Sequence, residues 1–115
     1  AVPQVDQDTP LGTALLAMSQ GGMGMTVVRG PTGEVAGIFT DGDLRRALER
    51  VGDLRTTPVR DVMTRKPRHI GPDELAAAAA DIMERQRISQ LLVMDSAGAL
   101  LGALHTLDLM RAKVI

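Results

Sequence analysis

Two short stretches of the sequence carry residue types that can do chemistry. GIFTDGDLRRA at residues 37–47 places Asp41 and Asp43 around a glycine, and His105 and Asp108 lie close together near the other end of the chain. Such groups can hold a metal ion, exchange protons with a substrate, accept hydrogen bonds from a ligand's hydroxyl groups, or start a helix. Two ligands without a cysteine or a third acid make a weak metal site. We therefore expect no bound metal and no cofactor.

Catalysis by this chain alone is the weakest functional hypothesis. A small enzyme would use Asp41, Asp43 and His105 as acid, base or metal ligands. The sequence shows neither a nucleophile–base pair nor a cluster of three ligands. We therefore expect that the chain is not an enzyme.

Composition narrows the classes of partner. The chain has 115 residues, a formal net charge of −1, no cysteine and Phe39 as its one aromatic residue. It therefore lacks the basic surface and the stacking side chains that bind nucleic acids. No apolar run approaches the ~20 residues of a membrane span, and no signal peptide is visible. We expect a cytoplasmic globular protein with an aliphatic core and neither a nucleic acid nor a membrane as partner.

The sequence repeats itself without a gap when it is shifted by 65 residues. GIFTDGDLRRA then falls on GALHTLDLMRA at residues 102–112. An ungapped match indicates duplication and has to be recognised before any motif is interpreted. The identical pairs are Asp8/Asp73, Ala14/Ala79, Met18/Met83, Val28/Val93, Gly33/Gly98, Gly37/Gly102, Asp43/Asp108, Leu44/Leu109, Arg46/Arg111 and Ala47/Ala112.

Each repeat predicts the same order of elements. An apolar face at helical spacing follows Asp8 in one repeat and Asp73 in the other, so we expect these residues to be helix N-caps. Two apolar runs joined by a turn predict a β-hairpin at residues 25–39 and again at 91–104. We expect a second helix over residues 43–51 and from residue 108 to the C-terminus. A short strand is expected before each first helix, at residues 3–5 and 68–70.

The predicted fold class is therefore α+β, with two pseudo-symmetric β-α-β-β-α repeats packed as a tandem pair. Neither repeat is large enough to bury its sheet alone. We place the repeats at residues 1–58 and 59–115. Ala1 aligns with Lys66, so the first repeat has no counterpart of VRDVMTR, and we expect a fragment of a longer protein.

The motifs carry a family resemblance. The doubled unit ending in GIFTDGD and GALHTLD resembles the cystathionine β-synthase (CBS) domain in its tandem form, and VRDVMTRKPRHI at residues 59–70 resembles the start of a second CBS repeat. GMTVV, GIFTDGDLRRAL, DVMT and HTLDLMRAKVI are similar to the C-terminal CBS pair of D-arabinose 5-phosphate isomerases. In that family a separate N-terminal sugar-isomerase domain does the chemistry. The resemblance implies a regulatory region, covalently attached to such a domain and homodimeric through its CBS pair.

The resemblance also implies where a ligand binds, because CBS pairs hold nucleotides in clefts between their repeats. We expect Asp43 and its counterpart Asp108 to accept hydrogen bonds from ribose, and Thr40 and Gly42 to approach a phosphate at the helix N-terminus. His105 replaces the usual Ser or Thr, so the two sites should differ. The remaining predicted contacts are Met25, Thr26, Val27, Gln90, Leu91 and Leu92 for the base, and some of Arg65, Lys66 and Arg68 for an anionic group.

Helix capping is the competing interpretation of these acids. An Asp in the first turn of a helix is favourable by a few tenths to about 1 kcal/mol without any ligand. Recurrence favours ligand binding for Asp43 and Asp108. Asp41 has Thr106 as its counterpart, and both residue types cap helices. We therefore assign Asp41 the capping role.

The resemblance implies a candidate effector, taken from the biosynthetic pathway in which arabinose 5-phosphate isomerases act. Arabinose 5-phosphate feeds the synthesis of the lipopolysaccharide sugar Kdo (3-deoxy-D-manno-octulosonate), which is activated as CMP-Kdo and carries ribose, phosphate and carboxylate groups. The first hypothesis is an allosteric module that senses a nucleotide or nucleotide-sugar effector, with CMP-Kdo as candidate and an adenine nucleotide as rival. The alternative is a structural dimerisation module with vestigial ligand sites.

Overall fold

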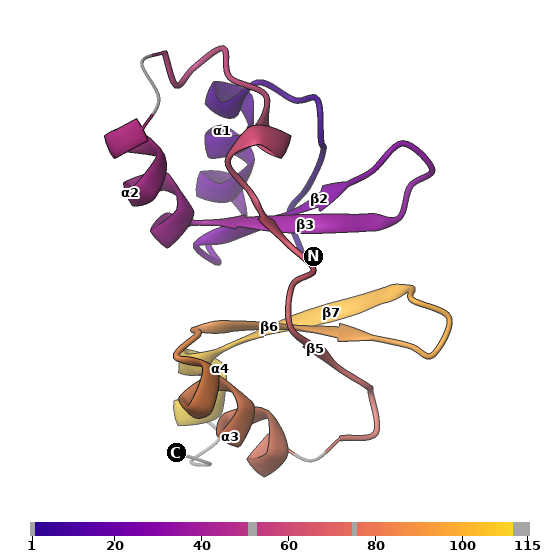
Figure 1. Ribbon diagram of the computed structural model, residues 1–115. Coiled ribbons are helices and arrows are strands. Elements are labelled where there is room, and N and C mark those ends of the chain that lie inside the picture. Colours follow the sequence, from indigo (N-terminus) through magenta and orange to yellow (C-terminus); the bar gives the residue numbers. More distant parts are fainter. Residues whose placement is uncertain (1, 51–52, 75, 112–115) are drawn as a thin grey trace. The chain divides into compact units, whose positions relative to one another are not determined.

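The computed structural model describes residues 2–50, 53–74 and 76–111. The chain divides into two compact units, Ala1–Lys66 and Pro67–Ile115 (Figure 1). Residues 59–66 thus belong to the first unit by their contacts, whereas the duplication assigns them to the second repeat. The boundary that we predict between residues 58 and 59 divides the two sequence repeats, and it stays a prediction.

The first unit is a four-stranded sheet with its helices on one face. Its elements are β1 (Gln4–Asp6), α1 (Leu11–Gly21), β2 (Met25–Arg29), β3 (Val35–Thr40), α2 (Asp41–Arg50), the 3₁₀ turn η1 (Val59–Asp61) and β4 (Thr64–Arg65). The sheet order is β1-β2-β3-β4, with β1 and β2 parallel and the other pairs antiparallel. Figure 1 shows α1 and α2 on the same side of β2 and β3.

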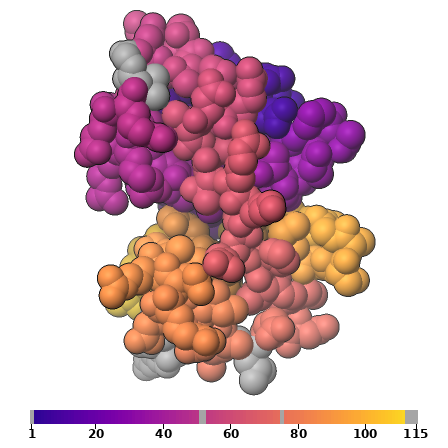
Figure 2. All heavy atoms as spheres, in the orientation of Figure 1, coloured from indigo at the N-terminus to yellow at the C-terminus, as the bar shows by residue number. Residues whose placement is uncertain are grey.

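The core of the first unit is aliphatic apart from Phe39, as the composition predicts. The expected helical face of Leu11, Ala14 and Met18 is buried in it against Val28 of β2. Val59 and Val62 close the core from the segment after α2. Figure 2 shows that segment in rose on the surface of the first unit, between α2 and the β2–β3 hairpin.

The second unit repeats the plan with one strand fewer among its described residues. It contains β5 (His69–Ile70), α3 (Ala76–Gln86), β6 (Gln90–Met94), β7 (Leu100–His105) and α4 (Thr106–Arg111). The sheet order is β5-β6-β7, with β5 parallel to β6 and β6 antiparallel to β7. Its core contains Ala79, Met83, Leu91 and Leu109, from both helices and the central strand. No described helix is long and apolar enough to cross a bilayer.

The duplication holds at the level of strand register. Met25 pairs with Thr40 in the first hairpin, and Gln90 pairs with His105 in the second, at the same offset of 65 residues. Even the irregularity in the ladder recurs, after Val28 in one hairpin and after Val93 in the other. The predicted order β-α-β-β-α is confirmed in both units.

Helix starts are where the sequence-based prediction was wrong. Asp8 does not cap α1, which begins after Pro10; its carboxylate forms an ion pair with Arg60 instead. Asp73 lies three residues before α3 begins at Ala76. The loop after β1 uses Asp8 to hold the 3₁₀ turn, a contact between distant residues that local spacing does not reveal. Two predicted helix ends, at residue 51 and at residues 112–115, lie outside the described residues.

Candidate functional site

The first unit places Thr40 and Asp43 in a reciprocal capping arrangement at the start of α2. The backbone N–H of Asp43 donates to Thr40 Oγ1 at 3.2 Å, and the backbone N–H of Thr40 donates to Asp43 Oδ2 at 3.0 Å. This is a capping box in which Thr40 is the N-cap. The capping role assigned to Asp41 was wrong: α2 follows β3 without a linker, so the last strand residue takes the cap position and Asp41 is already helical.

Asp43 is the centre of a buried polar network in the first unit. Its side chain is only 4% exposed. Besides the hydrogen bond from Thr40 N–H, its carboxylate accepts hydrogen bonds from Thr40 Oγ1 at 3.1 Å, Arg46 Nη2 at 2.6 Å and Thr64 Oγ1 at 2.8 Å. Both carboxylate oxygens therefore have partners within the unit. The Arg46 side chain is 63% exposed, so this is the partner that can leave at least cost.

The second unit keeps half of this arrangement. The backbone N–H of His105 donates to Asp108 Oδ2 at 2.7 Å, as Thr40 does to Asp43. His105 Nδ1 accepts the backbone N–H of Leu107 at 3.0 Å, so an imidazole replaces the hydroxyl as the cap. Asp108 is exposed, and its Oδ1 has no hydrogen-bond partner among the described residues. The two sites thus differ in the number of hydrogen bonds that each carboxylate accepts.

The strand residues predicted to surround a base lie at the same end of each sheet as the caps. Met25 pairs with Thr40 and Gln90 with His105. Because side chains alternate along a strand, Thr26 and Leu91 face the helices of their own unit with the core residues Val28 and Val93. The side chains on the opposite face of the two sheets are those of Met25, Val27, Gln90 and Leu92.

The basic run of Arg65, Lys66 and Arg68 joins the two units, and its three residues are exposed. Arg65 Nη2 donates to the carbonyl oxygen of Arg60 at 3.3 Å, within the first unit. Lys66 has a left-handed backbone with φ of 50°. The Arg68 carbonyl accepts the backbone N–H of Leu92 at 3.2 Å in the second unit. None of the three side chains contacts Asp43 or Asp108 through a hydrogen bond within the described part of the chain.

Sequence reasoning missed two residues of the network, Arg46 and Thr64. Arg46 recurs as Arg111 and lies three residues after Asp43, the spacing of side-chain pairs on a helix. That repeated identity was the available signal. Thr64 lies in the DVMT motif, but its contact with Asp43 spans 21 residues and depends on β4, which no pattern predicted.

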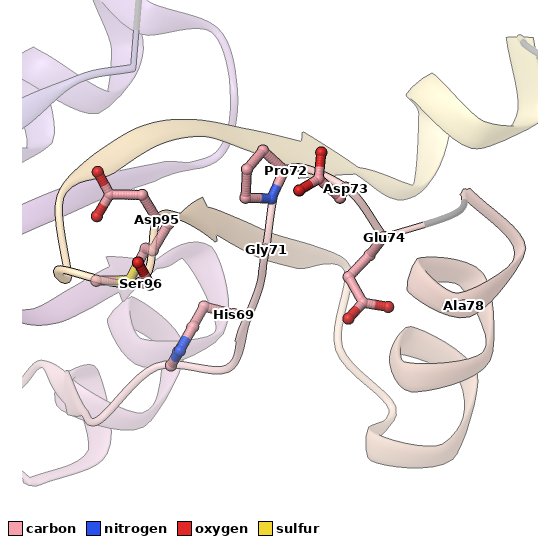
Figure 3. A pocket seen from close by; sticks show the side chains of 9 residues that line it. His69, Gly71, Pro72, Asp73, Glu74, Ala78, Asp95 and Ser96 are labelled. Carbon is pink, nitrogen blue, oxygen red and sulfur yellow. The ribbon is translucent and has the colours of Figure 1, made fainter.

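Each unit has a hollow on its surface. One, of about 420 Å³, is lined in the first unit by Leu15, Met18, Ser19, Gly22, Gly24 and Asp41, beside the start of α2. The other, of about 680 Å³, lies in the second unit between the loop that follows β5 and the turn that joins β6 to β7 (Figure 3). Its lining includes His69, Asp73, Glu74 and Asp95, and these carboxylates disfavour a phosphate. Within residues 2–50, 53–74 and 76–111, no three acidic or histidine side chains are placed to hold a metal ion.

A sequence profile described as the CBS domain matches residues 1–50 and 59–115. The chain belongs to the CBS domain family. Among curated relatives, 114 residues are 46% identical to "Arabinose 5-phosphate isomerase KdsD" of Pseudomonas aeruginosa, covering 99% of this chain and 35% of that protein. The corresponding isomerase of Yersinia pestis is 40% identical over 99% of this chain and 34% of its own length. The chain thus spans about a third of the length of these relatives.

Solved CBS structures show the same fold. The CBS-domain containing protein ATU1752 from Agrobacterium tumefaciens matches 98% of this chain and 84% of its own, with a TM-score of 0.89 and 24% identity. CBS domain protein PAE2072 from Pyrobaculum aerophilum, complexed with AMP, matches 94% of this chain and 82% of its own, with a TM-score of 0.86 and 19% identity. The resemblance stated from the sequence is confirmed, as is the α+β class.

Proposed function

We propose that this CBS pair is a regulatory, ligand-sensing module of an arabinose 5-phosphate isomerase. One observation carries the proposal: the same strand–cap–carboxylate arrangement occurs at the same register in both units, at His105–Asp108 as at Thr40–Asp43. A helix cap alone requires neither the same acid in both units nor the exposed carboxylate of Asp108. The identity to KdsD over nearly the whole chain supports the attached domain as an isomerase.

The second unit offers the more accessible acceptor for a ligand's diol. Asp108 Oδ2 is held by the His105 N–H, which orients the carboxylate, and Oδ1 is left to accept hydroxyl groups. At Asp43 a diol has to displace Arg46, whose guanidinium is then available to an anionic group. The Thr40 hydroxyl is engaged with Asp43 in both directions, so at this site a phosphate would be received by Gly42 N–H and Arg46 rather than by Thr40.

The effector is a nucleotide or nucleotide-sugar, with CMP-Kdo as the leading candidate. CMP-Kdo supplies a ribose diol that can donate hydrogen bonds to a carboxylate of the module. It also supplies a phosphate and a carboxylate that can bind Arg46 and the basic run Arg65, Lys66 and Arg68. An adenine nucleotide is the rival, supported by the AMP complex of the related fold from Pyrobaculum. In this proposal the effector signals to a covalently attached, cytoplasmic isomerase domain, the module itself is not catalytic, and two copies associate through their CBS pairs.

Titration calorimetry of the chain with CMP-Kdo, CMP, AMP and ATP tests the proposal. We expect saturable binding of at least one of them, weakened at least tenfold, or about 1.4 kcal/mol, by Asp108→Asn, which removes the charge that accepts the diol. Asp81→Asn is the matched control, because Asp81 is an exposed acid of the same unit whose carboxylate pairs with Arg85 and with no other side chain among the described residues. No heat with any of the four ligands contradicts the proposal, and so does an equal loss in the control.

A structural dimerisation module is the second candidate, and one observation favours it. The hydrogen bonds that the Asp43 carboxylate accepts all come from residues of its own unit, as in a purely structural cap. Leu16 on α1 and Leu48 on α2 are 59% and 61% exposed and offer apolar surface to a second copy. Under this alternative, Leu48→Glu abolishes the dimer in light scattering, while Asp108→Asn leaves every property of the full enzyme unchanged.

A further inference from the structure

The imidazole of His105 caps α4 through a nitrogen that has to be unprotonated. Its Nδ1 accepts the backbone N–H of Leu107 at 3.0 Å, while the N–H of Thr106 donates to the Ser89 carbonyl oxygen at 2.9 Å. A ring nitrogen accepts a hydrogen bond only while it carries no hydrogen, so the neutral ring holds its hydrogen on Nε2. In the protonated ring both nitrogens are donors, and the cap is lost.

The equivalent cap of the first unit has no such dependence. Thr40 and His105 are 65 residues apart and lie at the same register, opposite Met25 and Gln90. Thr40 Oγ1 accepts the backbone N–H of Asp43 at 3.2 Å. A hydroxyl oxygen keeps its lone pairs throughout the pH range in which histidine titrates. The duplication therefore holds two helix caps at one position, and a proton can remove only the second.

The charges of the second unit decide what a protonated His105 does. The first turn of a helix carries a partial positive charge, which repels an imidazolium. Asp108 lies in the same turn, and its Oδ2 accepts the backbone N–H of His105 at 2.7 Å. The protonated ring is thus repelled by the helix end and attracted by this carboxylate.

The other titratable groups of the second unit lie on several elements. β6 and β7 carry none besides His105, and His69 of β5 pairs with Leu92 on the far side of β6 from β7. Leu104 packs into the core beneath α3 and α4, so His105 lies on the opposite face of the sheet. The remaining groups on the helices and directly after α3 are Asp81, Glu84, Arg85, Arg87 and Arg111. Among the described residues, Asp108 is the charged group hydrogen-bonded to His105.

We propose that His105 makes the Asp108 site of the second unit sensitive to pH, through a helix cap that exists only with a neutral imidazole. The stability that the cap contributes is present while the ring is neutral. It is lost as the pH falls through about 6.5, where histidine takes up a proton in unstructured peptides. The protonated ring then releases the Leu107 N–H and turns to the Asp108 carboxylate. The Thr40–Asp43 arrangement of the first unit stays unchanged over the same range.

NMR of the chain alone tests the cap. At pH 7.5 the nitrogen-15 spectrum of the His105 ring should show the tautomer with its hydrogen on Nε2. The protection factor of the Leu107 amide, which removes the intrinsic pH dependence of exchange, should fall about fivefold between pH 7.5 and 5.5, while that of Asp43 stays constant. The other tautomer overturns the proposal, and so does a Leu107 protection factor that is equal at both pH values.

Two substitutions assign the response to one ring. His105→Thr supplies the residue of the first unit and should abolish the pH dependence at Leu107. His69→Gln is the matched control and should leave it intact, because the chain has only these two histidines and His69 is exposed on β5. A response that survives His105→Thr, or that is lost in His69→Gln, contradicts the proposal.

The consequence for an effector rests on the proposed function, in which Asp108 accepts a ligand's hydroxyl groups. A protonated His105 competes for that carboxylate. By calorimetry, the affinity for CMP or AMP should therefore fall between pH 7.5 and 5.5 by about threefold more in the unsubstituted chain than in His105→Thr, a comparison that cancels proton uptake by the ligand's phosphate. Equal falls overturn the link between cap and site. No binding at either pH contradicts the proposed function, while the NMR readouts still decide the cap.

Discussion

Replacing each of the repeated acids by alanine should have unequal consequences for stability. Asp43 and Asp108 occupy the same position of the duplicated sequence, so a sequence-based argument gives them the same weight. In the structure, Asp43 is buried with four hydrogen bonds, and Asp108 is exposed with one. We expect Asp43→Ala to destabilise its unit strongly and Asp108→Ala to destabilise its unit only slightly.

The size of each destabilisation follows from what happens to the hydrogen-bond donors when the carboxylate is removed. After Asp43→Ala, the exposed Arg46 and Thr64 turn to water, and each lost contact costs about 0.5–1 kcal/mol. The half-buried Thr40 N–H loses its partner, and with it the capping box, at about 1–2 kcal/mol. The total is about 2–4 kcal/mol. Asp108→Ala loses one exposed contact to His105 N–H, at about 0.5–1 kcal/mol.

Urea unfolding followed by circular dichroism at helical wavelengths is the appropriate assay, because the chain has neither Trp nor Tyr for intrinsic fluorescence. Asp43→Asn is the companion variant, since it keeps the volume and an acceptor oxygen and should recover part of the loss. Equal destabilisation by Asp43→Ala and Asp108→Ala would refute the reasoning, as would a stabilised Asp43→Ala.

Three further changes test the local physics. Arg87→Gly should stabilise the chain by about 0.5–1 kcal/mol in urea unfolding, because Arg87 directly follows α3 with φ of 53°, where its counterpart Gly22 has φ of 67°; a destabilised variant would contradict this. Thr40→Val should cost about 1 kcal/mol by removing the cap hydroxyl, whereas Thr40→Ser should cost little; equal losses by thermal unfolding would argue against the capping box. Asp8→Ala should shift the urea midpoint only slightly, since the exposed pair with Arg60 contributes under about 1 kcal/mol.

The order of elements could be predicted from the sequence because it depends on local patterns. Helical spacing in Leu11, Ala14 and Met18, paired apolar runs and the duplication itself are visible without tertiary information. The second repeat acted as an internal check on the first. The fold class and the family can therefore be predicted from the sequence alone.

The site was less predictable because its determinants are long-range. β4 is two exposed residues, Thr64 and Arg65, without alternation, and forms only because Gly37 leaves room for it. Thr64 of that strand donates a hydrogen bond to the buried Asp43 carboxylate, so DGD alone could not distinguish a ligand acceptor from the centre of a structural network. The cap residue is Thr40 and not the predicted Asp41, because the helix follows the strand without a loop. Sequence spacing locates such a boundary poorly.

The most direct test of ligand sensing is the rate of the isomerase to which we propose that this module is attached, measured on that whole enzyme across a titration of CMP-Kdo with AMP as the parallel arm. The account predicts a saturable change in rate with at least one of the two. It also predicts that Asp108→Asn moves the midpoint to at least tenfold higher concentration while leaving the rate without effector unchanged. A rate that responds to neither compound, or that responds identically in Asp108→Asn, contradicts the account.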